Sequence, residues 1–591
     1  MNIESQLSAR ISQALLDLYD QSMEVTLQTT RKDFAGSFTF VVFPLVKLLK
    51  KSPAELGEQI GTYLVANDEQ VTGFNVVQGF LNIELADSVW IDTFNHLLQS
   101  EFNGQLTPKN ESVMVEYSSP NTNKPLHLGH LRNNFLGNSI ARILKANGYD
   151  VVKACLVNDR GIHICKSMIA YQRFGNLETP QSSGLKGDHL AGKYYVIFDK
   201  AYKEEIAQLV AEGQTEDQAK KNAPILLEAQ QLLVRWEQGD AEVMALWSQM
   251  NNWVYEGFQA TYTKIGVDFD TTYYESNTYL LGKEVVEEGL AKGVFYQKED
   301  KSVWIDLSDE GLDHKLVLRG DGTSVYITQD LGTTDLKFQD FQNNRSIWVV
   351  GNEQDYHFQV LFAIMKKLGR SYANGCYHLS YGMVDLPTGK MKSREGTVVD
   401  ADDLVQEMID TAAETTKERG KIDDFTEEEA QNLFQMLALG ALKYFLLKVE
   451  PKKRMLFNPQ ESIDFQGNTG PFIQYTHARI QSILRKAHSQ SIALSSTIPA
   501  LALHPSEVTL IQLLADYPQQ IQKAANEYAP SVVANYTYDL AKNFNSFYAE
   551  CTVLNEPDAD IRGFRLALIA EVAKTIKNGM NLLGIDVPER M

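Results

Sequence analysis

Two histidines three positions apart, His127 and His130, stand where a strand-like stretch gives way to a helical pattern. Residues 112–117 alternate polar and apolar side chains, and apolar residues recur at helical spacing from Leu131 onward. The tetrapeptide His-Leu-Gly-His therefore opens a predicted helix, whose free N–H groups and partial positive charge suit a phosphate chain. Gly129 leaves room for a nucleotide against the backbone. For two isolated histidines, a helix cap and a core residue would be the more ordinary interpretation.

The strand and helix around these histidines begin a longer alternating pattern. From about residue 111, strand-like segments alternate with helical ones, which predicts a mostly parallel sheet covered on both faces. Residues 150–157 are the second expected strand, and three later strand-to-loop transitions fall within residues 325–338, 346–369 and 379–404. Ligands bind at the carboxyl ends of the strands in such sheets, so these polar transitions and the histidines are expected at one edge. The dinucleotide fingerprint Gly-x-Gly-x-x-Gly does not follow any strand.

The regions on either side of this sheet, and one within it, differ in pattern. Residues 1 to about 110 mix helical and strand patterns, and residues 76–85 are the clearest pair of strands around a glycine. Residues 183–262 are polar and helix-rich, which indicates a connective insertion. Beyond about residue 400 the pattern is almost entirely helical, and we expect a helical bundle over residues 470–591.

Composition narrows the class of protein. The 591 residues are 44% hydrophobic and 22% charged, which is ordinary for a globular protein of several domains. The start reads as an amphipathic helix rather than a signal peptide, and no apolar run is long enough to span a bilayer, so we expect a cytoplasmic protein. Four scattered cysteines favour neither a zinc ribbon nor a disulfide framework. The net charge of −21 restricts any RNA partner to local basic patches.

The residues around the histidines resemble a known family. Residues 118–130, SSPNTNKPLHLGH, are similar to the His-Ile-Gly-His signature of class I aminoacyl-tRNA synthetases, and the Ser-Pro-Asn plus lysine form resembles arginyl-tRNA synthetases. The resemblance implies an α/β fold with a Rossmann-like parallel-sheet catalytic domain, an N-terminal α+β accessory domain and a C-terminal all-helical domain. The implied domains are 1–110 (accessory, contacting tRNA), 111–400 (catalytic, with the 183–262 insertion), 401–469 (helical linker) and 470–591 (anticodon binding).

The resemblance also implies a reaction: ATP-dependent ligation of L-arginine to its tRNA through an arginyl-adenylate, in a monomer that needs bound tRNA even for the first step. A guanidinium is best recognised by carboxylates that accept forked hydrogen bonds. Tyr326 and Asp330 stand four residues apart, close enough to line one pocket, and Glu116 ends the first strand. The implied arginine-binding residues are Glu116, Ser119, Pro120, Asn121, His130, Tyr326, Asp330 and Gln354.

ATP is assigned by the resemblance to the histidine motif and to a lysine-bearing loop. Residues 389–396, GKMKSREG, resemble the family's KMSKS loop, but Ser393 stands where the class usually places its second, catalytic lysine. Lys124 occupies the place just upstream of the first histidine where many arginyl-tRNA synthetases carry a lysine, so we expect it to supply the transition-state charge. The implied catalytic residues are His127, His130 and Lys124, and the implied ATP-binding residues are His127, Gly129, His130, Lys390, Met391 and Lys392. Mg²⁺ is expected to arrive with ATP, without a metal site on the protein.

Contact with tRNA is expected at a basic and aromatic stretch, residues 442–457, because basic residues pair with phosphates and aromatic rings can stack on unpaired bases. Lys443 belongs to this stretch, and so do four residues assigned to tRNA: Lys448, Lys452, Lys453 and Arg454. In the C-terminal bundle the residues assigned to tRNA are Tyr475 and Arg479. Gln474 and His477 are further candidates there, although half of these residues could instead pack in the core.

Other functions stay open from the sequence. A non-catalytic RNA-binding paralogue would be expected to have lost a motif histidine, Lys124 or a pocket carboxylate, and all are present. A small-molecule nucleotidyltransferase shares the histidine motif and the sheet, but would not need the accessory domain or the helical C-terminal third. Within class I, the most similar alternative is a synthetase for cysteine or glutamate. The combination of Tyr326, Asp330 and Gln354 argues against that alternative.

Overall fold

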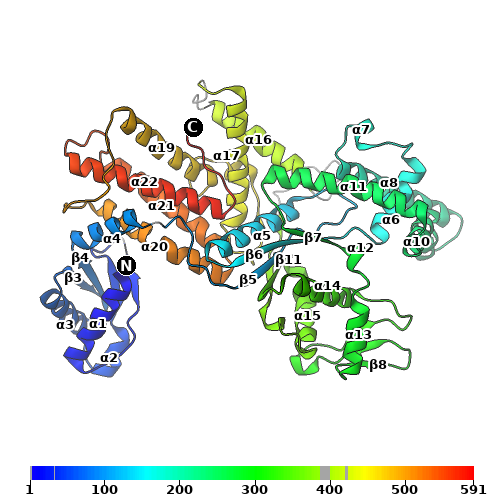
Figure 1. Ribbon diagram of the computed structural model, residues 1–591, viewed down its shortest axis with the longest axis horizontal. Helices are drawn as coiled ribbons and strands as arrows, with labels where there is room; N and C mark the ends of the chain where they lie inside the picture. Colours follow the sequence, from blue (N-terminus) through cyan, green and yellow to red (C-terminus); the bar gives the residue numbers. More distant parts are fainter. Residues whose placement is uncertain (1–2, 32, 101, 386–398, 419–423) are drawn as a thin grey trace. The chain divides into compact units, whose positions relative to one another are not determined.

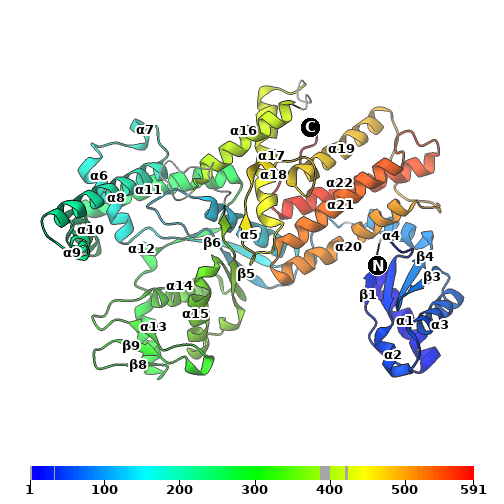
Figure 2. The same ribbon diagram turned by 180° about the vertical axis from the view of Figure 1, so that it is seen from behind.

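The computed structural model describes residues 3–31, 33–100, 102–385, 399–418 and 424–591 (Figures 1 and 2). The chain folds into two compact units, of which unit 1 comprises Met1–Asn103, Arg479–Pro518 and Asp539–Ile576, and unit 2 comprises Gly104–Ala478, Gln519–Tyr538 and Lys577–Met591. Within the described ranges, the helices are all too short or too polar to cross a membrane.

The N-terminal part of unit 1 is a small α+β domain. Its antiparallel sheet has the order β1-β2-β4-β3, with strands β1 (Leu27–Thr29), β2 (Phe38–Val41), β3 (Val71–Val77) and β4 (Phe80–Leu85). Gln78 (φ 47°) and Gly79 (φ 85°) form the turn between β3 and β4, so the predicted strand pair around a glycine is confirmed. The helices are α1 (Ile3–Tyr19), α2 (Phe43–Leu49), α3 (Pro53–Asn67) and α4 (Asp87–Gln99). Leu7, Ile11, Ile60 and Leu81 are among the apolar side chains that fill the core.

Unit 2 is organised around a five-stranded parallel sheet of order β12-β11-β5-β6-β7. Its strands are β5 (Ser112–Glu116), β6 (Asp150–Val157), β7 (Thr271–Tyr274), β11 (Arg345–Gly351) and β12 (Cys376–Tyr381). Val115 lies opposite Lys153 of β6 and Ile347 of β11. The predicted strand over residues 150–157 and the parallel α/β class are confirmed.

The strand order places a topological switch point beside β5. The chain runs outward from β5 to β6 and β7, and then returns to add β11 and β12 on the other side of β5. The crevice outside the carboxyl ends of the strands at such a point is where open α/β sheets bind ligands. Residues 117–127, with the histidine motif at their end, leave β5 at that edge and lead into α5 (Leu128–Ala146), which packs on β5, β6 and β11.

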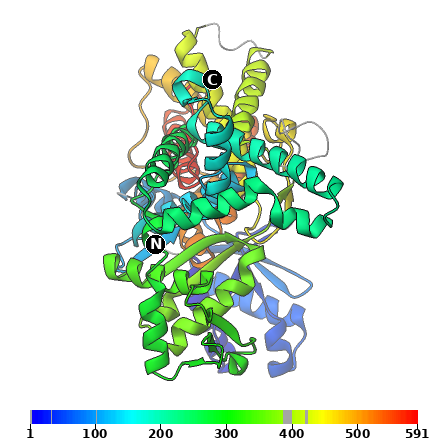
Figure 3. The ribbon, with the colours of Figure 1, turned by 90° about the vertical axis from the view of Figure 1, so that its right-hand side faces the viewer.

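A helical insertion separates β6 from β7. It contains α6 (Ile162–Phe174), α7 (Pro180–Ser183), α8 (Gly187–Ala211), α9 (Glu216–Asn222), α10 (Pro224–Glu237) and α11 (Ala241–Ile265), teal and green in Figure 3. Apolar residues of α6, α8, α10 and α11 share one core that includes Met168, Tyr194, Leu232 and Trp236. The predicted helix-rich insertion is therefore present, and it has a hydrophobic core of its own.

The chain segment that connects β7 to β11 forms helices and a small antiparallel sheet. It consists of α12 (Glu275–Thr278), α13 (Gly282–Ala291), α14 (Tyr326–Phe341) and an antiparallel sheet β10-β9-β8, with β8 (Phe295–Gln297), β9 (Val303–Ile305) and β10 (Lys315–Leu318). The expectation that residues 325–338 form a strand-to-loop transition is wrong, because α14 begins at Tyr326. Burial of Ile327 and Leu331 in a shared core outweighs the weak strand preference of the β-branched and aromatic residues there.

Helices dominate the remainder of the chain. After α15 (Asp355–Lys367) and β12 come α16 (Ala401–Glu418), α17 (Glu427–Leu447) and α18 (Pro459–Ser462), with the short parallel pair β13 (Val384–Asp385) and β14 (Met455–Leu456). The final helices are α19 (Gly470–Ser489), α20 (Pro505–Glu527), α21 (Pro530–Glu550) and α22 (Ala559–Leu582). The predicted all-helical C-terminal region is confirmed.

Candidate active site

The histidine motif forms the amino-terminal cap of α5. His127 is the N-cap residue, and its Nδ1 accepts a hydrogen bond from the Gly129 N–H at 3.1 Å. The His130 Nδ1 in turn accepts from the His127 N–H at 3.1 Å, so the two rings form a reciprocal capping box. Since both Nδ1 atoms act as acceptors, each neutral ring carries its proton on Nε2. The cap thus provides two N–H donors that the helix does not itself use.

The charge around this cap belongs to Lys124 rather than to the histidines. Burial and the positive charge of Lys124 lower the pKa of His127 to about 4. Burial, His127 and Lys124 hold the pKa of His130 well below its ordinary value. Lys124 is half-buried, and its ammonium group has no hydrogen-bond or carboxylate partner among the described residues. Burial lowers the pKa of Lys124, because its charged form has lost contact with water without gaining a counterion among the described residues.

The chain between β5 and the motif makes a strained turn. Ser118 (φ 76°) and Ser119 (φ 46°) are both in the left-handed region, which costs a non-glycine residue about 1–3 kcal/mol each. The Ser118 N–H donates to the Asn133 side chain of α5, and Ser118 Oγ lies 2.6 Å from the hydroxyl of Tyr262. Pro120 accepts from the Asn158 N–H at 2.9 Å, which continues the pairing with β6. These bonds fix the turn and leave the Asn121 side chain exposed.

Glu116 does not stand open at the end of β5. It is buried, and Lys337 of α14 donates to its Oε2. The Lys337 side chain is likewise buried, so the two charges compensate each other. An arginine bound nearby would therefore meet a neutralised pair with one carboxylate oxygen, Oε1, beyond the Lys337 contact.

Asp330 and Tyr326 lie one helical turn apart on α14, so their predicted proximity follows from helical and not strand geometry. Tyr326 is 79% exposed, and Asp330 Oδ2 lies 2.6 Å from His357 Nε2 of α15. Gln354, three residues before His357, is also exposed and precedes α15 in a short 3₁₀ turn, Asn352–Gln354. The His357 contact therefore links α14, which carries Asp330, to α15, whose N-cap residue is Gln354.

A carboxylate that the sequence did not single out belongs to the same region. Glu275 begins α12 directly after β7, and α12 packs against α14. Burial raises the pKa of Glu275 to about 7, with the negative charges of Asp159 and Asp330 acting in the same direction and Arg160 opposing them. Its carboxylate has no hydrogen-bond partner in the described part of the chain. A lone acidic residue after a strand carries no motif, and its position at the strand's carboxyl end was the one available signal.

The expected ATP loop falls on residues outside the described ranges, and so do its candidates Lys390, Met391 and Lys392. The chain on either side of it is described. Before it, β13 pairs with β14. After it, the Leu128 N–H donates to the Val399 carbonyl at 3.0 Å, and the Ala401 N–H donates to the Leu126 carbonyl at 3.0 Å. The chain that follows the expected loop is therefore joined directly to the histidine motif.

Asp188, His189 and Asp402 have the side-chain types and closeness of a metal site. The Lys186 ammonium group, however, donates to Asp402 and lies 3.2 Å from Asp188 Oδ2. A cation is thus already supplied to these carboxylates by the chain itself. The donor set does not fit a resident metal ion.

The predicted tRNA residues have different environments. Lys452 is exposed, Lys453 is exposed beside Glu450, and Arg454 makes a forked contact with Asp385. Lys448 donates to the Asn468 carbonyl at 2.8 Å. Lys443 is buried, donates to the Gly584 carbonyl, and has a pKa lowered to about 8 mainly by burial. Its place in an RNA-contacting stretch is wrong, because its charge faces the carboxyl-terminal segment of the chain.

Helix α19 carries four candidate tRNA residues, of which two are buried and two are partly exposed. Gln474 and His477 are fully buried and donate to the carbonyls of Asp586 and Pro588 at 2.8 and 2.9 Å, which confirms that half of this stretch packs in the core. Tyr475 and Arg479 are partly exposed. Tyr475 contacts the ring of Phe465 and Arg479 lies over that of Tyr548.

Three models of known protein families match consecutive parts of this chain. "Arginyl tRNA synthetase N terminal domain" matches residues 2–85, "tRNA synthetases class I (R), catalytic domain" matches residues 93–458, and "DALR anticodon binding domain" matches residues 473–591. The histidine motif and the candidate pocket residues all fall within the catalytic match.

Full-length relatives agree with these matches. The chain is 57% identical over 596 residues to "Arginine--tRNA ligase" of Amoebophilus asiaticus and 56% identical over 597 residues to that of Bacteroides thetaiotaomicron, with 100% of each chain covered. Among solved structures it resembles Thermus thermophilus arginyl-tRNA synthetase, at 25% identity and a TM-score of 0.77 over 100% of both chains. The chain belongs to the arginyl-tRNA synthetase family of class I aminoacyl-tRNA synthetases, and it is an arginine–tRNA ligase.

Proposed function

We propose that the site at the carboxyl ends of β5, β7 and β11 ligates L-arginine to tRNA in two steps. First, an arginine carboxylate oxygen attacks the α-phosphorus of ATP, and the bond to the departing pyrophosphate breaks. Second, a hydroxyl of the terminal adenosine of the tRNA attacks the arginyl carbonyl carbon, and AMP leaves. Positioning and charge stabilisation carry most of such a reaction.

The observation that carries this proposal is the arrangement of Lys124 and the two histidines. His127 and His130 donate through Nε2–H to phosphate oxygens as neutral groups, because their depressed pKa values keep them uncharged at neutral pH. Lys124 then supplies the positive charge that the α-phosphorus needs as charge builds up on its oxygens. A half-buried ammonium group without a counterion among the described residues is stabilised when a phosphate arrives. Gly129, one residue inside the helix, lets the adenosine approach the backbone.

The arginine pocket combines the predicted residues with Glu275. Asp330 and Glu275 supply negative charge for the guanidinium. Glu116 adds its Oε1 atom as an acceptor, because Lys337 contacts only Oε2. Tyr326 and Gln354 line the open side. The residues that follow β5, namely Ser119, Pro120, Asn121 and His130, hold the amino and carboxylate groups of the substrate. Lysine or an uncharged analogue would leave buried acceptors unpaired, which rejects it strongly without an editing step.

The expected loop residues Lys390, Met391 and Lys392 complete the ATP site in this proposal and follow the pyrophosphate. Mg²⁺ enters with ATP and neutralises phosphate charge. Lys448, Lys452, Lys453, Arg454, Tyr475 and Arg479 contact the tRNA, and Lys452 and Lys453 have the exposure that a phosphate contact needs. The enzyme acts as a monomer in the cytoplasm.

Aminoacylation of total tRNA with each of the 20 amino acids tests the proposal. We expect arginine alone to be charged, and arginine-dependent exchange of pyrophosphate into ATP to need tRNA. His130→Ala and Asp330→Ala should each lose more than about tenfold in kcat/KM, since charge-assisted contacts contribute about 1.5–3 kcal/mol. An unaffected Asp330→Ala enzyme would contradict the pocket, and efficient exchange without RNA would contradict the order of binding.

A further inference from the structure

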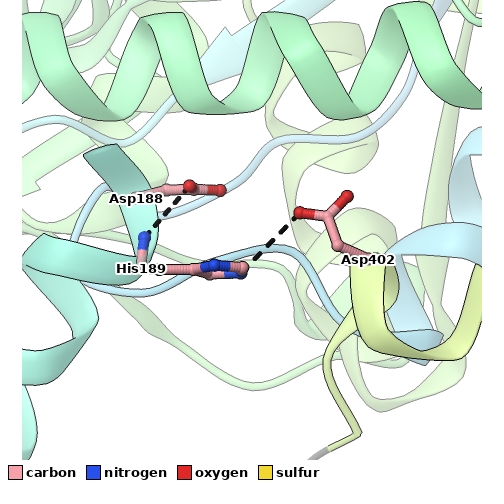
Figure 4. Close-up of side chains that lie close together, drawn as sticks. All are labelled: Asp188, His189 and Asp402. Atoms are coloured by element: carbon pink, nitrogen blue, oxygen red, sulfur yellow. Dashed lines mark hydrogen bonds and ion pairs between the residues drawn. The ribbon is translucent and has the colours of Figure 1, made fainter. Parts of the chain in front are cut away.

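The first turn of α8 lies against the chain that follows the expected ATP loop. Figure 4 shows Asp188 and His189 of α8 facing Asp402 of α16. His189 Nε2 lies 3.0 Å from Asp400 Oδ2 and 3.7 Å from Asp402 Oδ2. Lys186 donates to Asp402 and, at 2.6 Å, to the Thr261 hydroxyl of α11. A lysine and a histidine of the insertion therefore contact Asp402, and the histidine also contacts Asp400, the residue just before α16.

Asp400 connects this cluster to the histidine motif. Its Oδ1 accepts from the N–H groups of Asp402 and Asp403 at 2.8 and 3.1 Å, which caps α16, while its Oδ2 faces His189. Its backbone lies opposite His127 in an antiparallel bridge, between the two hydrogen bonds that join Val399 and Ala401 to the motif. A single residue thus joins α8, α16 and the N-cap of α5.

Helix α8 also packs against the residues that precede the motif. A Cβ at Gly192 of α8 would lie only 2.9 Å from Pro125 Cδ and 3.7 Å from Lys124 Cα. Glycine at this position therefore allows the helix to approach the chain that carries Lys124. In addition, the charge of Asp400 is close enough to His127 to raise its pKa against the larger effects of burial and Lys124.

We propose that Lys186 and His189 are positioning residues for ATP: they hold Asp402 and Asp400, and through them the backbone of Val399–Ala401, against the histidine motif. His127 and His130 then keep the orientation in which their Nε2–H groups meet the phosphates. The proposal rests on the proposed function, in which these histidines bind ATP. The insertion would therefore contribute to the chemistry of the site as well as connecting two strands.

The contact predicts a dependence on pH. Asp188, Asp400, Asp402 and Lys186 are the charged groups that face His189. Burial opposes a charge on His189, but the hydrogen bond to Asp400 and the charges of Asp188 and Asp400 outweigh it and raise the pKa of His189 above its ordinary 6.5. The imidazolium–carboxylate pair is therefore formed below the raised pKa of His189, and it is lost as the pH rises through that pKa.

The test measures the KM for ATP and for arginine by pyrophosphate exchange with tRNA present, from pH 6 to pH 9, for His189→Gln, Asp400→Asn and Lys186→Met. We expect Asp400→Asn and Lys186→Met to raise the KM for ATP about tenfold, at the low end for a charge-assisted contact, with less than about a twofold change in the KM for arginine. The wild-type KM for ATP should rise on the alkaline side, and that of His189→Gln should stay flat. In the double variant His189→Gln/Asp400→Asn, the effects should not add, because both changes remove one contact.

Lys193→Met is the matched control, because Lys193 lies on the same helix but pairs with Glu178, at 2.7 Å, rather than with Asp400 or Asp402. Lys186→Arg keeps the charge and should restore most of the ATP affinity. Folding of each variant is checked by its thermal midpoint, and His189→Gln serves if Lys186→Met does not fold. Unchanged ATP affinity and an unchanged pH profile in folded variants would overturn the inference, as would tight binding of Mn²⁺ or Zn²⁺ that Asp402→Asn abolishes. If His130→Ala also exchanges normally, the proposed function itself fails; if only the positioning variants do, this inference alone fails.

Discussion

Replacing Lys124 by methionine should separate activity from stability. The ammonium group of Lys124 is half-buried without a partner among the described residues, so it contributes nothing by ion pairing in the free enzyme and meets the phosphate only when ATP binds. A charge-assisted hydrogen bond is worth about 1.5–3 kcal/mol, which corresponds to about a 10- to 150-fold fall in kcat for adenylate formation. The desolvation that lowers the pKa of Lys124 is a cost to the folded state. The variant should therefore be at least as stable as the wild type.

The assay is arginine-dependent pyrophosphate exchange with saturating tRNA, together with urea unfolding. Lys124→Arg should keep much of the rate, because it keeps the charge. Lys145→Met is the matched control, since Lys145 lies on the exposed face of the last turn of α5, far along the same helix. Loss of the Lys124 charge also removes one of the causes that depress the pKa of His127, so the acid limb of the pH profile should move upward from about 4. A kcat within about threefold of wild type, or a fall equal to that of Lys145→Met, would refute the assignment.

Four further substitutions test the arginine pocket, a buried guanidinium and the division between exposed and buried lysines. Glu275→Gln should raise the KM for arginine above pH 7 and have little effect below it, because the carboxyl has a pKa of about 7 and carries charge only above that pH; an equal effect at pH 6 and pH 8 would contradict a charge-based role. Arg132→Met should lower the free energy of unfolding by about 1–3 kcal/mol per carbonyl left unpaired. The reason is that the fully buried guanidinium donates to two backbone carbonyls at 2.8 and 2.9 Å. An unchanged free energy in urea unfolding would contradict this stabilising role. Lys452→Gln should raise the KM for tRNA, with a smaller effect at high salt, because Lys452 is exposed. Lys443→Gln should lower stability without changing the KM for tRNA, because Lys443 is buried. A raised KM for tRNA in Lys443→Gln and an unchanged one in Lys452→Gln would contradict these assignments.

Local patterns in the sequence were sufficient wherever one element determines its own geometry. The start of α5 at the histidine motif, β6 over residues 150–157 and the hairpin through Gly79 all follow from periodicity and turn residues. The pattern was misleading where packing decides. Residues 325–338 contain β-branched and aromatic residues typical of strands, yet Ile327 and Leu331 share a buried helical face.

Side chains with long reach were harder to place. Lys443 stands in a basic run, and its environment is set by the Gly584 carbonyl 141 residues further along the chain. Gln474 and His477 likewise donate to carbonyls near the C-terminus. A run of lysines or polar residues looks the same in the sequence whether it meets water, RNA or a backbone carbonyl, because the partner lies far away in the chain.

The sequence by itself determined the class of fold, the family and the histidine motif, since these depend on residues that are close together in the chain and on signatures that the family shares. The tertiary structure decided which charges are available for chemistry. It compensates Glu116 with Lys337, leaves Lys124 without a counterion among the described residues, and brings Glu275 into the electrostatic field of Asp330. The interaction energy between two charged groups and the pKa of each depend on their separation and burial. The fold sets both quantities, and the spacing of the residues along the chain does not.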